Sequence, residues 1–348
     1  MSLISLVDLK ERVVAILLAC GLNAAHADET AEALVTTDAM GVFTHGCKLL
    51  AGYVKKLQAG GYNPQAQPTI EREGPAWAVI NGHSSLGQVG GVFAVRHAIE
   101  KASRFGIAYV GLKNVGHIGA AGYYANVAAR QGFIAMVTGN DIPSVAVPGS
   151  RRAVLGSNPL AYAIPVADGD PILLDIATAA VAGGKVYAAL RRGQPIPSTW
   201  LIGADGLPTT DGSLYPHSAA LAPMAGHKGY GLGLWCEIMS SILPGGNMTW
   251  QVGSWMFDPP TRPSWHNASF TVIDVSAVAP PEEFRERIRK LIDELHDSPT
   301  AEGSDRVLLP GEREWMNYRA AQEHGIPLPI DVEESLCRAA ELTGVRFP

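Results

Sequence analysis

The chain contains 348 residues, more than one ordinary hydrophobic core uses, so two domains are expected, with one large or discontinuous domain as the alternative. Hydrophobic residues make up 47% of the sequence and charged residues 17%, which favours a compact soluble protein and argues against disorder. The net charge of -6 comes without a basic block, which argues against nucleic acid and membrane surfaces as partners and favours a small molecule.

The start of the chain and its cysteines indicate a cytoplasmic protein. Residues 1–8 lack the basic and then apolar pattern of a signal peptide. The apolar run 13–20 is much shorter than the roughly 20 residues that span a bilayer. The four cysteines lie far apart in the sequence, so neither a zinc ribbon nor a redox pair is predicted.

The first sixty residues predict helices. Residues 8–20 and 28–40 are each followed by a glycine, as at a helix C-terminus. Between residues 50 and 57 apolar side chains recur at i, i+3, i+4 and i+7, and Gly60 and Gly61 follow. We therefore expect a helical unit at the N-terminus.

From residue 76 the pattern changes to short apolar or β-branched runs that alternate with helices. Helices are expected at about 89–104 and 120–131, and an Asp-Gly turn at residues 168–169 predicts a hairpin. Helices together with a hairpin favour an α/β domain around a mixed sheet. The expected strands are 76–80, 107–112, 133–139, 160–165, 171–177 and 268–275.

The last third of the chain predicts further helices. Residues 227–243 begin glycine-rich and continue as an expected buried helix, with one face formed by Leu232, Trp235, Cys236 and Met239. The charged segment 282–295 is typical of a solvated amphipathic helix, and the tail after residue 328 is helical again. Both ends are thus helical and the middle is α/β.

Two histidines stand beside glycines at positions that a ligand could approach. His45 lies at a helix N-terminus, before Gly46, and His117 lies between Gly116 and Gly119 where a strand gives way to a helix. Helix capping or packing could also explain His45, and the end of a strand could explain His117. The residues alone leave both interpretations open.

Four more segments carry turn or anion-binding chemistry. Residues 156–159 form a turn before a strand, and residues 173–185 place small side chains after one. The segment 226–233 spaces glycines around Lys228 at a helix start, as phosphate-binding loops do. Residues 308–315 look like a turn that enters a helix. None of these matches the G-x-G-x-x-G dinucleotide fingerprint or a Walker loop.

Six segments in order do resemble a known family, the type-2 malate/L-lactate dehydrogenases. That family includes ureidoglycolate, sulfolactate and diketogulonate oxidoreductases and reductases of cyclic imino acids. The resemblance implies a non-Rossmann α/β fold with a mixed-sheet NAD(P)-binding domain, residues 76–280. It also implies a helical, dimer-forming domain, residues 1–75 with 281–348, and a homodimer with the active site near the subunit contact. The segments are DAMGVFTHGCKLLAGY, NVGHIGAAGYYA, GSNPLAYAIP, LDIATAAVAGGKV, GHKGYGLGL and LLPGEREW.

The resemblance also implies roles for individual residues. His45 resembles the general acid/base, and His117 resembles a substrate contact that could instead carry the proton. Further candidate substrate contacts are Thr44, Lys48, Tyr53 and Asn158. The NAD or NADP cofactor is expected against Asp175, Ile176, Ala177, Thr178, Ala179, Ala180, Val181, Lys228, Gly229, Pro310, Gly311 and Glu312.

The chain departs from the family pattern at two positions. Thr44 stands where the family usually has Ser, which keeps a hydroxyl. Leu49 stands where the family usually has Arg, and a leucine cannot clamp a carboxylate with two hydrogen bonds. Lys48 replaces that arginine imperfectly, because neighbouring helical residues point about 100° apart. The substrate therefore stays open at this stage.

The expected reaction is hydride transfer between a nicotinamide and C2 of a 2-hydroxy or 2-oxo acid, with the reduction of a cyclic imino acid as an alternative. A zinc hydrolase built on His45, His117 and His227 is a rival of another class, since three imidazoles can bind zinc. A non-catalytic nucleotide or small-molecule binder is a third. The sequence leaves NAD against NADP, and the direction of the reaction, undecided.

Overall fold

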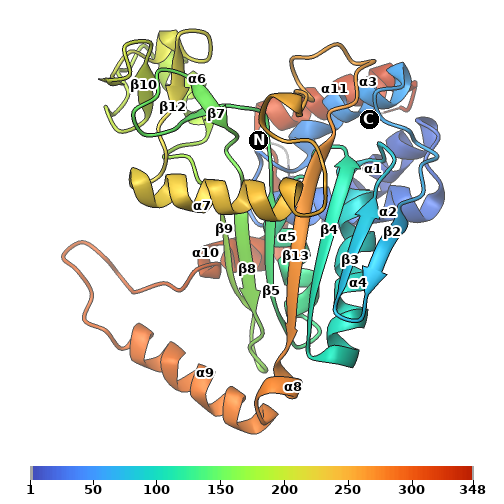
Figure 1. The fold of residues 1–348 in the computed structure, drawn as a ribbon, viewed down its shortest axis with the longest axis vertical. Helices are drawn as coiled ribbons and strands as arrows, with labels where there is room; N and C mark the ends of the chain where they lie inside the picture. The colour runs from blue at the N-terminus through green and yellow to red at the C-terminus, as the bar shows by residue number, and fades with distance from the viewer. Residues whose placement is uncertain (1–2, 347–348) are drawn as a thin grey trace.

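The computed structural model describes residues 3–346 and has a mixed α/β fold around a seven-stranded sheet (Figure 1). β3 and β4 are parallel, and every other neighbouring pair in this sheet is antiparallel, which confirms the mixed sheet expected from the sequence. In spatial order the strands are β2 (Thr69–Gly74), β3 (Trp77–Asn81), β4 (Ile107–Val115), β13 (His266–Asp274), β5 (Phe133–Gly139), β8 (Leu160–Ile164) and β9 (Ile172–Ile176).

Antiparallel pairing brings chemically active segments to one end of this sheet. β4 and β5 finish at that end, at Val115 and Gly139, and β13 starts there because its His266 pairs with Val115. The expected β8–β9 hairpin is confirmed and sets Ala161 opposite Asp175. The loops that leave or enter five strands are therefore neighbours, although they are far apart in the sequence.

Two helices cover one face of the sheet and one helix crosses the other. α4 (Gly87–Phe105) and α5 (Ala121–Ala129) share a core with Val110 of β4 and Phe270 of β13. α7 (His227–Glu237) runs across the strands (Figure 1) and continues into η3 (Ile238–Ile242), a π-helical turn. The Tyr109 hydroxyl donates to the Met239 carbonyl at 2.6 Å, which fastens η3 to β4.

A separate helical cluster contains residues from both ends of the chain. Leu9, Tyr53 and Leu336 belong to one core, and β1 (Leu3–Ile4) pairs with β14 (Ile326–Pro327). The helices involved are α1 (Leu6–Ala19), α2 (Ala24–Ala39), η1 (Cys47–Leu49), α3 (Leu50–Ala59), α10 (Glu312–His324) and α11 (Ile330–Thr343).

α8 (Val275–Val278) leads from β13 into α9 (Pro281–His296), which projects from the body with only Ile288 buried (Figure 1). This matches the solvated amphipathic helix expected from its charge pattern. Across residues 3–346, no helix combines the length and apolarity needed to cross a bilayer.

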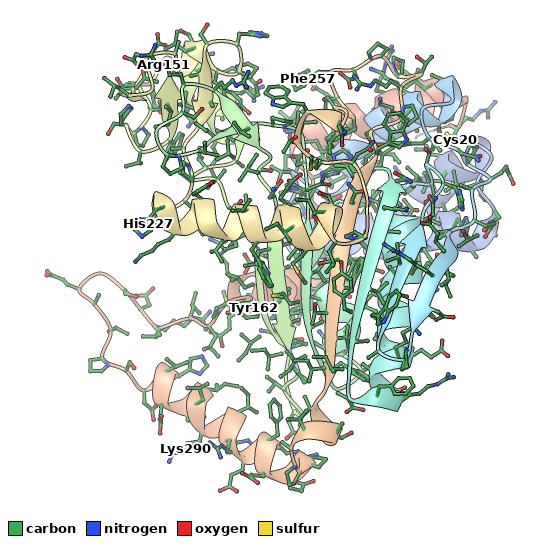
Figure 2. All side chains as sticks on the ribbon, in the orientation of Figure 1. Cys20, Arg151, Tyr162, His227, Phe257 and Lys290 are labelled. Carbon is green, nitrogen blue, oxygen red and sulfur yellow. The ribbon has the colours of Figure 1, made fainter. Side chains whose placement is uncertain are left out.

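A small five-stranded sheet with its own core lies above α7 in Figure 1, near Arg151 in Figure 2. Sequence analysis missed it because strands of two or three residues carry no measurable period, and it missed the edge strand β2 because the side chains there are polar and exposed. The small sheet contains β6 (Val145–Ala146), β7 (Ala153–Leu155), β10 (Leu201–Gly203), β11 (Pro208–Thr209) and β12 (Ala219–Leu221). α6 (Gly183–Arg191) and η2 (Gly212–Leu214) lie between these strands in the chain, and η4 (Thr249–Gln251) contacts β7.

Residues 227–243 are helical as expected, but the prediction that their apolar face is buried is wrong. Cys236 is fully buried, but Leu232 is 37% exposed and Trp235 is 46% exposed. Both exposed residues precede the π-helical turn at Ile238, so the period itself is kept: a spacing of 3.6 residues places apolar side chains on one face of a helix but does not determine whether that face packs against the rest of the chain. The helix instead presents apolar side chains to the surface.

Candidate active site

His45 and His117 lie side by side although 72 positions separate them in the chain. The centroids of their rings are 5.9 Å apart and the ring planes differ by 29°. His45 comes from the turn after α2 and His117 from the loop after β4, so the helical cluster and the sheet each supply one imidazole. The structure thus brings together the two histidines that sequence analysis singled out.

The His117 ring is fixed by hydrogen bonds at Nδ1. The Tyr53 hydroxyl lies 2.8 Å from Nδ1, and the Gly119 backbone N–H donates to the same atom at 3.3 Å. A backbone donor requires Nδ1 to accept, so the proton of the neutral ring is on Nε2. Tyr53 is fully buried on α3, and the Trp255 ring lies 5.2 Å from that of His117. Neutral His117 therefore presents an Nε2–H donor.

His45 is oriented by its own neighbours. The Thr44 hydroxyl lies 2.9 Å from Nδ1 of His45. In the tautomer in which Nδ1–H donates a hydrogen bond to this hydroxyl, Nε2 is free to accept. The Asp38 carboxylate accepts the Cys47 backbone N–H at 2.9 Å and supports the turn. Gly46 is required here, because a Cβ at that position would lie 1.9 Å from Oδ1 of Asp38. The turn therefore holds His45 at one place beside His117.

Burial keeps both imidazoles neutral near neutral pH. It lowers the pKa of His45, with the charges of Asp175 and Asp141 opposing the shift. It also lowers the pKa of His117 well below its usual range, and the charges of His266 and His45 act in the same direction while Asp141 opposes. A neutral imidazole can accept a proton from a substrate hydroxyl, and its conjugate acid can return one.

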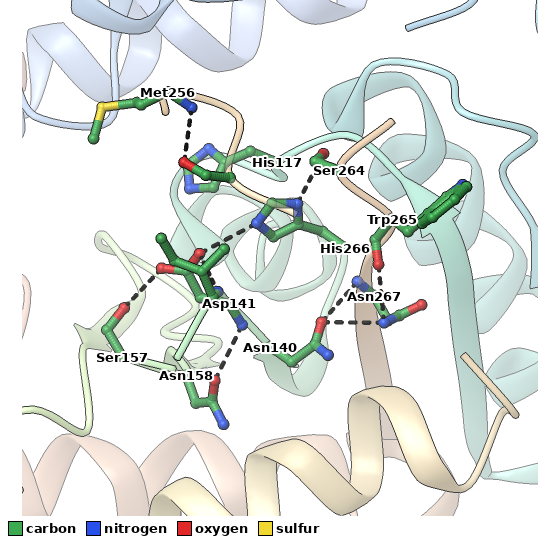
Figure 3. Close-up of polar contacts among 12 residues, drawn as sticks. His117, Asn140, Asp141, Ser157, Asn158, Met256, Ser264, Trp265, His266 and Asn267 are labelled. Atoms are coloured by element: carbon green, nitrogen blue, oxygen red, sulfur yellow. Dashed lines mark hydrogen bonds and ion pairs between the residues drawn. The ribbon is translucent and has the colours of Figure 1, made fainter. Parts of the chain in front are cut away.

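A third histidine belongs to the same cluster and was missed from the sequence. The rings of His117 and His266 meet edge to face with centroids 5.5 Å apart, and His266 is 1% exposed. Nε2 of His266 lies 3.2 Å from Oδ1 of Asp141, which follows β5 (Figure 3). Each residue taken alone looks like an ordinary loop or strand position. The pairing of β13 beside β5 was the signal that could have found them.

Two expected substrate contacts have other partners in the structure. Asn158 is fully buried: its amide donates to the Gly233 carbonyl and to Glu237, and its oxygen accepts from the Asp141 backbone N–H. Both donor hydrogens are thus used within the protein, so the geometry favours a structural role for Asn158. The Lys48 ammonium forms an ion pair with Asp331 of α11 at 2.6 Å. Its charge is thereby paired within the protein.

The expected cofactor segments lie against one another and against the histidines. The Thr178 carbonyl accepts the Met224 backbone N–H, and the Met224 carbonyl accepts that of Gly229, at 2.9 and 2.8 Å. Residues 175–181 therefore adjoin the start of α7. Asp175 accepts the Gly122 backbone N–H at 2.7 Å, which ties this segment to the helix that follows His117. Burial raises the pKa of Asp175, while the Gly122 bond and the nearby His45 oppose the shift.

The start of α7 suits the phosphates of a nucleotide cofactor. No side chain caps the helix, and a Cβ at Gly226 or Gly231 would meet nothing within 4 Å. Lys228 is exposed in the first turn, where the free backbone N–H groups and the helix dipole attract anions. The residues present therefore fit a dinucleotide.

The third expected cofactor segment lies along β9. The Leu173 backbone N–H donates to the Pro310 carbonyl at 3.0 Å, and Gly311 packs against Leu173. A pocket of about 240 Å³ opens beside Pro310 and Glu312. Residues 310–312 and Asp175 are thus attached to the same strand.

The zinc site considered from the sequence does not form. His227 is exposed at the first residue of α7 (Figure 2), and it does not join the pair of His45 and His117. Within residues 3–346, no three His, Cys, Asp or Glu side chains are grouped as metal ligands. A hydrolase built on these three histidines is therefore not supported.

Comparison with known proteins gives a consistent result. The family model described as malate/L-lactate dehydrogenase matches residues 4–337. The chain is 37% identical over 340 residues to a malate dehydrogenase of Pyrococcus horikoshii, covering 96% of this chain and 93% of that protein. It is 35% identical over 318 residues to the NAD(+) ureidoglycolate dehydrogenase of Escherichia coli K12, covering 91% and 89%. The solved structure of the delta1-piperideine-2-carboxylate reductase of Pseudomonas syringae matches with a TM-score of 0.87 and 29% identity, over 98% of this chain and 100% of that one.

Proposed function

The chain belongs to the malate/L-lactate dehydrogenase family and is a nicotinamide-dependent oxidoreductase of small hydroxy acids, and we propose that His45 carries the proton while a hydride moves to or from C2 of a 2-hydroxy or 2-oxo acid. The observation that supports this assignment is the convergence of His45 and His117 at 5.9 Å beside Asp175 of the expected cofactor segment. Proton and hydride chemistry can therefore meet at one substrate bond.

The two imidazoles have different tasks in this proposal. His117 holds the substrate oxygen by donating from Nε2, because its Nδ1 already accepts from the Gly119 backbone. His45 takes the hydroxyl proton at Nε2 during oxidation and, once protonated, returns it to the developing alkoxide during reduction. Tyr53 orients His117 and Thr44 orients His45. Much of the contribution of the protein is positioning, because each group is held by a neighbour.

The nicotinamide supplies or accepts the hydride when it is bound. We propose that Asp175, Ile176, Ala177, Thr178, Ala179, Ala180 and Val181 lie along it, with Lys228 and Gly229 at its phosphates and Pro310, Gly311 and Glu312 at β9. The uncapped start of α7 and the backbone contacts through Met224 support this arrangement. Either NAD or NADP satisfies these contacts, and the choice is left to the assay below.

A cyclic imino acid is the second candidate substrate. The match to the piperideine-carboxylate reductase supports it, as does the position of Leu49, which is 4% exposed and cannot clamp a carboxylate. The same groups would serve, since a protonated His45 could deliver a proton to the nitrogen while the hydride adds to carbon.

We also propose the larger organisation that the resemblance implies. The fold would divide into a helical domain, residues 1–75 with 281–348, and a non-Rossmann cofactor domain, residues 76–280, in a cytoplasmic homodimer. The core shared by both chain ends supports the helical domain. The exposed apolar side chains of Leu234, Trp235 and Ile238 on α7 and η3 support a subunit contact, because exposed apolar patches mark interaction surfaces, and this contact would involve the cofactor domain in addition to the helical domain.

The experiment is a nicotinamide absorbance assay with pyruvate, oxaloacetate, sugar-derived oxo acids and cyclic imino acids, using each cofactor in turn. The proposal predicts turnover of at least one oxo acid or imine, and its loss in His45→Ala. Tight nicotinamide binding without turnover of any compound would instead support the rival of a non-catalytic binder. Size-exclusion chromatography with light scattering tests the dimer.

A further inference from the structure

Asp141 is an anion in the active site that the proton chemistry of His45 and His117 does not use. Its Oδ1 accepts from the Ile142 backbone N–H at 2.8 Å and from His266 at 3.2 Å, and its Oδ2 accepts from the Ser157 hydroxyl at 3.1 Å (Figure 3). A carboxylate offers about four acceptor sites, so one direction at Oδ2 has no partner in the described chain. The side chain keeps 25% exposure, and a ligand can reach it.

A chain of hydrogen bonds fixes Asp141 relative to His117. The His117 backbone N–H donates to the Tyr62 hydroxyl at 3.2 Å, which lies 3.0 Å from the Ser264 hydroxyl. That hydroxyl lies 3.0 Å from Nδ1 of His266, whose Nε2 meets Asp141. One assignment of hydrogens satisfies every member: each donates to the next, and Asp141 accepts last. In this assignment Asp141 is a carboxylate.

The charge of Asp141 is maintained despite its surroundings. Burial raises the pKa of a carboxyl group, but the bond to His266 and the charges of His266 and His117 outweigh it and lower the pKa of Asp141 to about 2. The group is thus ionised throughout the physiological range.

Among the described residues, neither Lys nor Arg acts on the two imidazoles, and the basic group bonded to Asp141 is the imidazole of His266. Leu49 is an apolar, buried side chain that carries no charge, and Lys48 is paired with Asp331. The charged groups that act on the two imidazoles are Asp141, Asp175 and histidines, without Lys or Arg. The site is therefore electronegative.

We propose that Asp141 determines substrate specificity: it selects 2-hydroxy or 2-oxo acids whose distal group is cationic or donates hydrogen bonds, and it disfavours a second carboxylate. A substrate with a second carboxylate beside Asp141 binds more weakly, because like charges repel. An ammonium or guanidinium group instead donates a hydrogen bond to Oδ2 in its free acceptor direction. This inference rests on the proposed function, because it concerns a substrate held beside His45 and His117.

The test compares the 2-oxo acid analogues of arginine, norleucine and glutamate, which carry a cationic, a neutral and an anionic distal group. The wild-type kcat/KM should favour the arginine analogue over the glutamate analogue by at least about tenfold, as expected for a charged hydrogen bond. In Asp141→Asn the value should fall for the arginine analogue and rise for the glutamate analogue, each expressed relative to the norleucine analogue, which corrects for any loss common to all three acids. Opposite changes are a result that a purely structural role would not produce.

Asp168→Asn is the matched control. Asp168 is an exposed carboxylate paired with Arg289, and it lies in the turn between β8 and β9, at the opposite end of these strands from Leu160 and Ile176. It should leave all three values unchanged. A wild type that prefers the glutamate analogue overturns the proposal without any variant, so misfolding of Asp141→Asn cannot hide a failure. An equal loss for all three acids in folded Asp141→Asn also overturns it. Turnover of none of the acids or imines with either cofactor would overturn the proposed function as well.

Discussion

The two sides of the active site are built differently. His45 and Tyr53 come from the helical cluster that both chain ends form, whereas Asp141 and Asp175 come from one end of the sheet, Asp141 from the loop after β5 and Asp175 from β9. The helical side supplies the neutral imidazole of His45, and the sheet side supplies that of His117 together with the carboxylates and the expected cofactor segments. Substitutions on the helical side should therefore change proton transfer, and substitutions at Asp141 should change the preference for the charge of the substrate.

Removal of the imidazole at position 45 should have the largest effect. His45→Ala should lower kcat by roughly 100-fold or more, because general acid–base catalysis contributes about that much. His117→Ala should raise KM as well as lower kcat, since it removes the donor to the substrate oxygen. Steady-state kinetics measures both, with circular dichroism as the control for folding. A near-normal kcat in both variants would show that neither imidazole carries the proton.

The hydroxyl of Tyr53 should matter through His117. Tyr53→Phe keeps the buried ring but removes the 2.8 Å contact with Nδ1, so His117 is less well oriented. We expect kcat/KM to fall by about tenfold, the scale of one lost hydrogen bond to a functional group. Tyr109→Phe is a suitable comparison, because its hydroxyl contacts η3 instead of a histidine. Equal losses in the two variants would argue against the orienting role.

The pH dependence should reflect the buried state of the imidazoles. Oxidation needs neutral His45, and burial lowers its pKa from the ordinary 6.5. As pH falls from 8, kcat/KM for oxidation should therefore stay level through 6.5 and decline only below it. The same sign applies to folding: a group whose pKa is lowered in the folded state stabilises the fold above the unfolded pKa and loses that contribution as pH falls below 6.5. An acid limb centred above 6.5 would contradict this.

Lys48 should have the smallest effect. It pairs with Asp331 at the surface, where both side chains are more than a third exposed, so its removal should cost less than about 1 kcal/mol of unfolding free energy. Lys48→Ala should leave KM for every active substrate within about twofold. A large rise in KM would restore Lys48 as a carboxylate contact.

The sequence predicted those parts of the fold that carry a strong period or turn signal. The helices of the N-terminus, the β8–β9 hairpin and the mixed sheet were recovered, with boundaries shifted by a few residues, as for α2, which starts at Ala24 rather than at residue 28. The short strands of the small sheet, β6, β7, β10, β11 and β12, were not predicted, because pairing between distant short segments leaves no local pattern.

The same limit applies to the site. His45 and His117 stand beside glycines in recognisable motifs, so the sequence could single them out. Asp141 and His266 meet only because β13 inserts between β4 and β5, which no local pattern predicts. Asn158 shows the opposite limit: its motif is recognisable, so a substrate contact was predicted, but the sequence could not show that its amide donates to Glu237 and to the Gly233 carbonyl.

A crystal structure of the chain with bound oxidised cofactor tests the central claim most directly. We predict that C4 of the nicotinamide faces the space next to Nε2 of His45 and His117, with the phosphates at Lys228 and Gly229. A nicotinamide ring bound away from both imidazoles, or phosphates held by another part of the chain, would contradict the proposed mechanism.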